Sequence, residues 1–362
     1  MRMTYPASSL GVGGRSTFRD SQLTADPLVP TGDPLNWGVV STGNIARTVT
    51  KELALLPDAG LHAVSSRSAE SAQAFASEFG FTKSYVGHRQ LLADDDVDIV
   101  YVAAPHGQHY SIVHDALTAG KHVLCEKAFT IDALEAAELV RLAGMNRVFL
   151  MEALWTRFLP SFQRALQIVH SGDLGTPHWA RADLGFPAPR TTPLGRIWDP
   201  HAGGGALLDL GVYTLTWPVS VFGLPETVTA VGQLSAEGVD QQCDLQLSYK
   251  DAFAHATCSL VARCGATATI AAEDGRLDVF EGGNHPRTLV LTDSNGDVRA
   301  ERFQPAGRGY TYELREVMDC VRAGKLESDL MPLAETQAVM SIFDEVRRQL
   351  GVHYPTTAER AE

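Results

Sequence analysis

Short apolar runs alternate with stretches of helical spacing in the chain from residue 35 onwards. The apolar runs predict buried strands at residues 36–41, 61–65, 98–104, 122–126 and 147–151. Apolar residues at intervals of three and four predict helices at residues 44–56, 69–79, 111–119 and 131–143. Strands that alternate with helices in this way favour right-handed βαβ units, and therefore an α/β domain with a doubly wound parallel sheet of the Rossmann type.

The pattern changes after residue 159. Helical spacing returns at residues 161–171 and 207–222, and again in two closing helices at residues 310–323 and 332–350. Strand-like runs lie between them, with turn signals such as Asn295-Gly296, at residues 179–186, 228–234, 244–249, 254–261, 267–272, 276–279 and 288–291. We therefore expect an α+β C-terminal domain with a large, mostly antiparallel open sheet.

These changes divide the 362 residues into four parts. Residues 1–34 are rich in Ser, Thr, Gly and Pro and lack apolar periodicity, so they are predicted to be a flexible leader, with a partner-wrapping arm as the alternative. Residues 35–158 form the predicted Rossmann domain and residues 159–350 the second domain. Residues 351–362 are predicted to be a C-terminal tail.

Charge and cysteine content narrow the classes of function. The net charge of −13 argues against nucleic acid or an anionic membrane as the main partner, because both demand a basic surface. No apolar run approaches the roughly 18 residues that cross a bilayer, and the N-terminus lacks the apolar stretch of a secretory signal. The five cysteines have no metal-ligand spacing, so we expect no metal site, reduced thiols and a cytoplasmic protein.

A candidate phosphate-binding turn follows the first predicted strand. The pattern G-x-G-x-x-G/A is matched, with serine in its first position, by Ser41, Thr42, Gly43, Asn44, Ile45 and Ala46. Gly43 lets the backbone approach a pyrophosphate, and the N-terminus of the next helix supplies N–H donors and partial positive charge. The strand before and the helix after favour a dinucleotide site over an ordinary tight turn, which is the alternative.

The residues after the second strand indicate which dinucleotide would bind. An Asp or Glu there holds the ribose 2′-hydroxyl of NAD, whereas this chain has Ser66, Arg67 and Ser68. Arg67 can form a charge-assisted fork with the 2′-phosphate of NADP, helped by the two hydroxyls. NADP is therefore the predicted cofactor and NAD a weaker alternative; otherwise Arg67 is a solvated side chain that begins a helix.

Two segments carry candidate catalytic side chains. Glu126 and Lys127 follow the strand at residues 122–126, at the carboxyl edge of the sheet where ligands bind in open α/β folds. Further on, a glycine run leads into a helix that would place Asp209 and Tyr213 at i and i+4 on one face. An aspartate in so apolar a helix needs a partner or a function. The alternatives are a surface lysine and a core helix with a satisfied aspartate and a buried tyrosine.

Together these motifs resemble those of the Gfo/Idh/MocA oxidoreductases, and the resemblance extends over about residues 35–350. It is carried by residues 41–46, 126–127 and 204–213. Within the family, Met-Glu-Ala-Leu-Trp-Thr-Arg-Phe at residues 151–158 and Met-Pro-Leu-Ala-Glu at residues 331–335 are similar to one branch. That branch contains dimeric trans-dihydrodiol dehydrogenases and NADP-dependent D-xylose 1-dehydrogenases, which implies hydride transfer at a CH–OH group of a sugar or vicinal diol.

The resemblance implies roles for matching residues. Lys127 matches the family's catalytic lysine, Asp209 its acid, Tyr213 the acid/base and Arg67 the 2′-phosphate ligand. Tyr213 would then take the hydroxyl proton of the substrate. A free tyrosine titrates about three units above pH 7, a difference of roughly 4 kcal/mol. A lysine about 4 Å away supplies about 4 kcal/mol at an effective dielectric of about 20, so Lys127 alone could provide this.

Other matching positions lie around the cofactor. His106 and His109, which follow Pro105, match positions beside the nicotinamide, with a solvated loop histidine as an equal alternative for either. Two residues depart from the family pattern. Ala128 replaces the usual proline of Glu-Lys-Pro, which suggests a looser lysine loop, and Ser71 stands where close relatives have a second arginine, which weakens the preference for NADP.

Further candidates for substrate contact lie at the end of the predicted Rossmann domain and in the second domain. Trp155, Arg157 and Phe158 are candidates to line the pocket, with core packing as an equal alternative. Arg196 and Trp198 lie shortly before the glycine run and are weaker candidates. We expect the second domain, which carries Asp209 and Tyr213, to bind substrate, and the resemblance implies that its open sheet makes a homodimer.

Alternative functions share parts of this pattern. The same motifs would serve a keto-sugar or anhydro-sugar reductase, because fold and cofactor do not fix the substrate. A non-catalytic regulator that senses NADP or a sugar is another alternative, although Lys127, Asp209 and Tyr213 together argue against it. A short-chain dehydrogenase is disfavoured by the lack of Tyr-x-x-x-Lys, and a zinc alcohol dehydrogenase by the cysteine spacing.

Overall fold

The structure, a computed structural model, describes residues 25–355 except residue 192. The chain forms two compact units: the Rossmann unit, Asp26–Trp155 with Pro305–Thr336, and the sheet unit, Thr156–Gln304 with residues 337–355. The prediction of one continuous second domain over residues 159–350 is therefore corrected. The chain returns to the Rossmann unit at Pro305, which a linear division of the sequence could not show.

The sheet of the Rossmann unit is parallel throughout, as predicted, with strand order β3-β2-β1-β4-β5-β6. Its strands are β1 (Leu35–Val40), β2 (Ala59–Ser66), β3 (Lys83–Val86), β4 (Ile99–Val102), β5 (His122–Glu126) and β6 (Leu150–Ala153). Every residue of β4 is buried, as expected of a parallel strand covered on both faces. The order reverses between β1 and β4, and ligands of such folds bind at the carboxyl ends of these strands.

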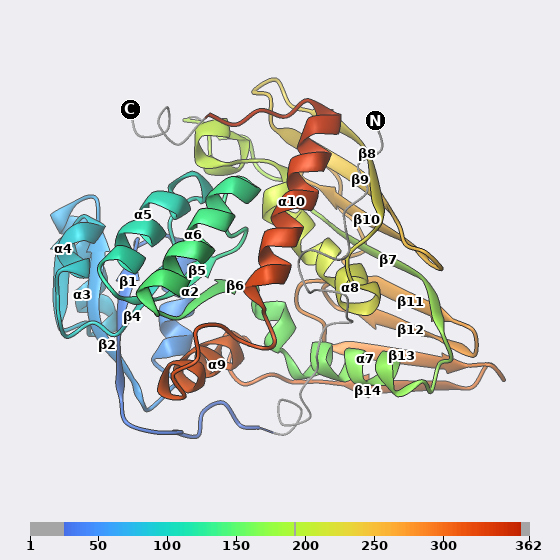
Figure 1. Cartoon of the computed structure of the whole chain (residues 1–362), viewed down its shortest axis with the longest axis horizontal. Helices are drawn as coiled ribbons and strands as arrows, with labels where there is room; N and C mark the ends of the chain where they lie inside the picture. Colours follow the sequence, from blue (N-terminus) through green and yellow to red (C-terminus); the bar gives the residue numbers. More distant parts are fainter. Residues whose placement is uncertain (1–24, 192, 356–362) are drawn as a thin grey trace. The chain divides into compact units, whose positions relative to one another are not determined.

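The helices of the Rossmann unit are α2 (Asn44–Leu53), α3 (Ala69–Phe79), α4 (His88–Leu92), α5 (His106–Thr118), α6 (Ala133–Asn146) and α9 (Thr311–Arg322). Helices α5 and α6 pack side by side over one face of the sheet (Figure 1), and α2 contacts α9. Helix α5 begins at His106 rather than at residue 111, because Pro105 caps a polar first turn that carries no apolar periodicity. Neither α4 nor β3 was predicted, since both are short and half-exposed.

The sheet unit contains eight strands in the order β14-β13-β12-β11-β7-β10-β9-β8. They are β7 (Pro177–Gly185), β8 (Thr227–Leu234), β9 (Asp240–Ser248), β10 (Phe253–Ser259), β11 (Ala268–Ala272), β12 (Gly275–Phe280), β13 (Thr288–Asp293) and β14 (Val298–Arg302). Only β7 and β10 pair in parallel, so the predicted mostly antiparallel sheet is confirmed. Strand β14 was missed because it is an exposed, charged edge strand.

The remaining elements are η1 (Trp155–Phe158), α7 (Pro160–Ser171), η2 (Arg196–Trp198), η3 (Pro200–Ala202), η4 (Leu207–Gly211), α8 (Val212–Phe222) and α10 (Leu333–Leu350). Helices α7 and α8 pack on one face of the eight-stranded sheet (Figure 1). The segment Pro200–Phe222 is long and apolar enough to cross a membrane, contrary to the prediction that no run is. Its most apolar window is 94% buried inside the protein, which fits a core helix.

The described residues of both predicted ends make contacts within the folded units. Residues 1–24 of the predicted leader lie outside the described residues, but the rest of it packs on α9. The Nε of Arg315 donates to the carbonyl of Pro27 at 2.9 Å, and Arg322 donates to the carbonyl of Asp33 at 2.7 Å. In the predicted tail, the hydroxyl of Tyr354 donates to the carbonyl of Gly204. The leader and tail predictions are therefore wrong for these residues, and residues 356–362 lie outside the description.

Candidate active site

The predicted phosphate-binding turn lies between β1 and α2. Strand β1 ends at Val40, and Gly43 is the N-terminal capping residue of α2. Among the described residues no side chain caps the first turn of this helix, which leaves its first N–H groups for an anion. The hydroxyl of Thr42 lies 3.4 Å from that of Ser66, at the end of β2. The turn therefore fits the pyrophosphate of a dinucleotide.

Ser41 adopts a backbone conformation that favours glycine. Its φ is +94°, a region in which a Cβ costs about 1–2 kcal/mol. We expect Ser41→Gly to stabilise the protein by about 0.5–1 kcal/mol, because glycine also loses about 0.5–1 kcal/mol more entropy on folding. Urea unfolding followed by circular dichroism measures this. Ser66→Gly, at ordinary backbone geometry, is the control, and equal destabilisation by both changes would show that Ser41 carries no strain.

The residues that would select NADP follow β2. Arg67 is exposed, and Ser68 caps α3 by accepting a hydrogen bond from the backbone N–H of Ser71 at 3.2 Å. The hydroxyls of Ser68 and Ser71 lie 3.0 Å apart. Ser71, which departs from the family pattern, thus takes part in the cap of the helix, and Arg67 is the cation at this end of the strand.

The lysine loop follows β5 at the same edge of the sheet. Glu126 is buried and accepts hydrogen bonds from the hydroxyl of Tyr101 at 2.5 Å and from the backbone N–H of Lys127 at 3.3 Å. Lys127 is half-exposed, and its peptide bond to Ala128 is cis. Sequence reasoning missed Tyr101, although a hydroxyl in the otherwise apolar strand β4 was a signal that a polar partner lies nearby.

Two histidines of α5 hold the backbone of this loop. His106 is 4% exposed, and its Nε2 lies 3.0 Å from the carbonyl oxygen of Lys127. His109 is fully buried, with Nδ1 3.0 Å from the carbonyl oxygen of Ala128 and Nε2 2.8 Å from that of Ala104. The solvated-loop alternative is therefore wrong for both histidines. Both histidines thus contact the backbone of the lysine loop, and the expectation that Ala128 loosens this loop stays a prediction.

In the sheet unit, Asp209 lies in a π-helical turn rather than in an α-helix. Leu207–Gly211 forms η4, and α8 follows from Val212 with Tyr213 in its first turn. The prediction of an α-helix from residue 207 is therefore corrected for this turn, while the sharing of one face by Asp209 and Tyr213 stays a prediction. Both side chains are buried, at 7% exposure each. Such turns occur often at functional sites.

The buried carboxylate of Asp209 has an ion-pair partner. A guanidinium nitrogen of Arg196 lies 3.2 Å from its Oδ1, so one predicted substrate residue is brought to a predicted catalytic residue. Trp198 is instead 1% exposed, donates to the carbonyl of Pro189 at 3.1 Å and lies under the guanidinium of Arg190. Its geometry therefore matches a packing role, and its contact with substrate stays a prediction.

The other substrate candidates are buried within η1. The ring of Trp155 stacks on that of Tyr310, with centroids 4.3 Å apart. Arg157 and Phe158 are almost fully buried. Core packing accounts for Phe158, while the roles of all three in substrate binding stay predictions. Trp155 belongs to the Rossmann unit with Lys127 and the cofactor residues, whereas Asp209, Tyr213 and Arg196 belong to the sheet unit.

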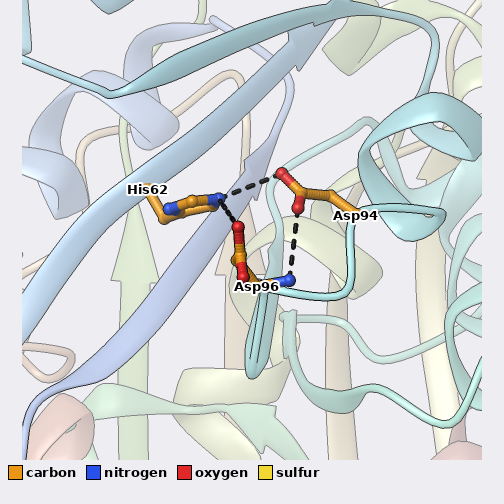
Figure 2. A group of neighbouring side chains, drawn as sticks. All are labelled: His62, Asp94 and Asp96. Carbon is orange, nitrogen blue, oxygen red and sulfur yellow. Dashed lines mark hydrogen bonds and ion pairs between the residues drawn. The ribbon is translucent and has the colours of Figure 1, made fainter.

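A separate polar cluster has the residue types of a metal site. Figure 2 shows His62 of β2 with Asp94 and Asp96, whose potential ligand atoms lie within 4.8 Å of one another. However, the ammonium of Lys83 lies 3.0 Å from Asp94 and 3.2 Å from Asp96. Burial raises the pKa of Asp94, but hydrogen bonds from Lys83 and Tyr85 outweigh it and hold that pKa below its usual range. Lys83 thus offsets one of the two carboxylate charges and occupies the side of the cluster that a metal ion would need, so we interpret the cluster as structural.

Comparisons with known proteins define the class of this chain. The family model GFO_IDH_MocA, an oxidoreductase family with an NAD-binding Rossmann fold, matches residues 35–154, and that of the GFO/IDH/MocA C-terminal domain matches residues 162–278. The chain therefore belongs to the Gfo/Idh/MocA oxidoreductases. It is 34% identical over 334 residues to the trans-1,2-dihydrobenzene-1,2-diol dehydrogenase of Mus musculus, which covers 89% of this chain and 98% of that relative.

Solved structures share the fold over most of the chain. The 3-ketoreductase of Actinomadura kijaniata, in complex with NADP and TDP-benzene, is 24% identical, has a TM-score of 0.78 and covers 88% of this chain and 98% of its own. Levoglucosan dehydrogenase, in complex with NADH and levoglucosan, is 19% identical with a TM-score of 0.80 and the same coverage. The fold class, the recognised family and the prediction of a dehydrogenase are confirmed.

Proposed function

We propose that this protein is an NADP-dependent dehydrogenase that transfers a hydride between the nicotinamide and a CH–OH group of a small polyol. The substrate class is an aldopentose or aldohexose such as D-xylose, or a vicinal diol such as a trans-dihydrodiol. The observation that carries the proposal is the lysine loop: Lys127 follows β5 at the edge of the sheet that also bears the phosphate-binding turn. The names of the diol dehydrogenase relatives support the diol, and those of the sugar oxidoreductase neighbours agree with the sugar.

The proposed chemistry assigns one task to each side chain. Bound NADP supplies or accepts the hydride. The ammonium of Lys127 stabilises the negative charge that develops on the substrate oxygen as its proton departs. Tyr213 exchanges that proton: its phenolate accepts the proton in oxidation, and its phenol donates the proton in reduction. Asp209, held by Arg196 at 3.2 Å, orients the substrate hydroxyl or the phenol.

A substrate panel tests the proposed function directly. Pentoses, hexoses and vicinal diols are each offered with NADP⁺, and reduced nicotinamide is followed by its absorbance. We expect turnover with at least one polyol. Tight binding of NADPH without turnover of any compound in either direction would instead favour a regulator that senses the cofactor.

Cofactor preference depends on Arg67 in this proposal. A guanidinium at the end of β2 can pair with the 2′-phosphate, a charge-assisted interaction of about 1.5–3 kcal/mol. We therefore expect the native enzyme to have a higher kcat/KM with NADPH than with NADH, and Arg67→Ala to lose roughly 10- to 100-fold with NADPH only. Steady-state kinetics with both cofactors measure this. Arg89→Ala, at another exposed arginine of the same unit, is the control, and preference of the native enzyme for NADH would contradict the assignment.

We also propose a homodimer formed by the open face of the eight-stranded sheet. Strand register places Val231, Phe253 and Phe280 on the face opposite α8, and 41–66% of each is exposed. The same face carries a groove in which Arg181, Arg276 and Asp278 flank aromatic rings. Mixed charges around exposed apolar groups suit a self-complementary contact between two copies.

Light scattering after size exclusion tests the dimer. Phe253→Asp combined with Phe280→Asp puts unpaired charges at the proposed contact, so we expect the dimer to dissociate into monomers. Leu134→Asp, on the exposed surface of α6, is the matched control and should leave the mass unchanged. A native monomer, or a double variant that stays dimeric, would contradict this interface.

The proposed location is the cytoplasm. All five cysteines are free thiols. The sulfurs of Cys243 and Cys258 face each other across β9 and β10 at 3.2 Å without a bond, as expected where thiols are kept reduced.

A further inference from the structure

A buried aspartate of β9 contacts the start of the turn that carries Asp209. Asp240 is fully buried, and its Oδ2 accepts a hydrogen bond from the backbone N–H of Leu207 at 2.6 Å. The first N–H groups of a helix have no partner within the helix, so an acceptor from a distant strand replaces the usual capping side chain. The other oxygen, Oδ1, has no hydrogen-bond partner among the described residues.

The glycine run is shaped around this carboxyl group. Gly205 has a φ of +121°, and a Cβ at this position would overlap Oδ1 of Asp240. Only glycine therefore allows both the conformation and the close approach. The carbonyl of Gly205 in turn accepts the backbone N–H of Asp209 at 3.3 Å. A displacement of the turn is thus passed on to Asp209 through one hydrogen bond.

Tyr354 holds the same turn from the C-terminal segment. Its hydroxyl donates to the carbonyl of Gly204, and the guanidinium of Arg347 lies 5.1 Å from the centre of its ring. The backbone N–H of Gly205 donates to the carbonyl of Ile197 at 2.9 Å, next to Arg196. The turn is therefore held by two segments that are distant in the sequence, at Asp240 and Tyr354, and by the nearby backbone of Ile197.

Burial disfavours the charged form of the Asp240 carboxyl group. Burial raises its pKa to about 7, although the backbone N–H groups of Leu207 and Ala206 and the charge of Arg347 act in the opposite direction. Tyr354 and Cys243 are the other titratable groups whose interactions with it are resolved. The neutral acid keeps the hydrogen bond from Leu207, so asparagine is a close mimic of the form that dominates below neutral pH.

We propose that Asp240 and Tyr354 are positioning residues that fix the turn at residues 204–207 and thereby the placement of Asp209 and Tyr213. The inference rests on the proposed function, because it gives the turn its purpose through the acid/base group. Misplacement of a reacting group by about 1 Å can cost 10²-fold in rate. A cap of this kind therefore acts on turnover rather than on cofactor binding.

The test compares Asp240→Ala, Asp240→Asn and Tyr354→Phe with the native protein. Asp244→Asn is the matched control, since Asp244 lies on the same strand and accepts a hydrogen bond from Thr257 instead. We count active sites by NADPH binding and express kcat per site. We expect Asp240→Ala to lose about tenfold or more, Tyr354→Phe to lose less, and Asp240→Asn to stay within about threefold of native, with the KM for NADP unchanged in all three.

Hydrogen exchange of the amides at residues 207–213 provides a readout that needs no substrate. We expect exchange to be about tenfold faster in Asp240→Ala and near native in Asp240→Asn and Asp244→Asn. Native exchange in Asp240→Ala, no rescue by asparagine, or a loss of kcat that only follows the loss of NADPH-binding sites would overturn the proposal. If Asp240→Ala does not fold, Tyr354→Phe decides by the same two measurements. If no polyol is turned over, the proposed function fails, and the exchange experiment still judges this inference.

Discussion

Lys127→Met and Tyr213→Phe are each expected to lower kcat for hydride transfer by about 10²–10⁴-fold. The first removes the charge that stabilises the developing alkoxide, and the second removes the group that exchanges the proton. NADPH affinity in Tyr213→Phe should stay within about threefold of native, because this residue belongs to the sheet unit rather than the Rossmann unit. Single-turnover kinetics with the best substrate of the panel and fluorescence titration with NADPH measure the two effects.

Matched controls separate chemistry from general damage in these variants. Lys250→Met and Tyr110→Phe change the same atoms at positions away from the proposed site, so both should keep native turnover. Near-native turnover in either Lys127→Met or Tyr213→Phe would remove that residue from the mechanism. A loss much greater in the double variant than in either single variant would show that the two groups act independently rather than as one unit.

Asp58→Asn is expected to destabilise the Rossmann unit by about 3–5 kcal/mol. Asp58 is 3% exposed and binds Arg315 through two hydrogen bonds of 2.6 and 2.7 Å and Arg322 through one of 2.9 Å. Its loss leaves the buried guanidinium of Arg315 without its counter-charge, while Arg322 keeps only Asp319 at 3.6 Å. Urea unfolding at pH 7 measures the difference, with Asp95→Asn at an exposed position as the control.

The ion pairs of Asp58 with Arg315 and Arg322 also predict that the free energy of unfolding depends on pH. Burial raises the pKa of Asp58, but hydrogen bonds from Arg315 and the backbone of Thr31 outweigh it and hold that pKa well below its usual range. A carboxylate with a lowered pKa stabilises the fold above its unfolded pKa of about 4 and loses that contribution as pH falls further. The difference in the free energy of unfolding between the native protein and Asp58→Asn should therefore become smaller below about pH 4. A difference that does not change with pH, or one below about 1 kcal/mol at pH 7, would contradict the stabilising role of the charged Asp58.

Local signals explain the parts of the fold that the sequence predicted well. Helix α3 begins and ends where predicted, because Ser68 caps it and Gly80 ends it with a φ of +79°. Strand β5 has the predicted bounds because its apolar run stops at Glu126. The cofactor turn and Lys127 were found for the same reason: each directly follows a strand that is recognisable from its own residues.

Contacts between distant residues explain what the sequence could not predict. The π turn η4 contains the hydrophobic spacing of an α-helix, and its start is bound by Asp240, which lies far along the chain. His106 and His109 read as loop residues, because the carbonyl groups that they contact belong to the segment after β5. Neither partner carries a local signal for the other, so composition and periodicity could not connect them.

The return of the chain at Pro305 limits how this protein can be dissected. A gene fragment that stops at residue 158 would encode every strand of the parallel sheet yet omit α9. Asp58 would then lack Arg315 and Arg322, and Glu52 would lack the backbone N–H groups of residues 308 and 309. Chimaeras that exchange cofactor specificity with a relative should therefore transplant Asp26–Trp155 and Pro305–Thr336 together.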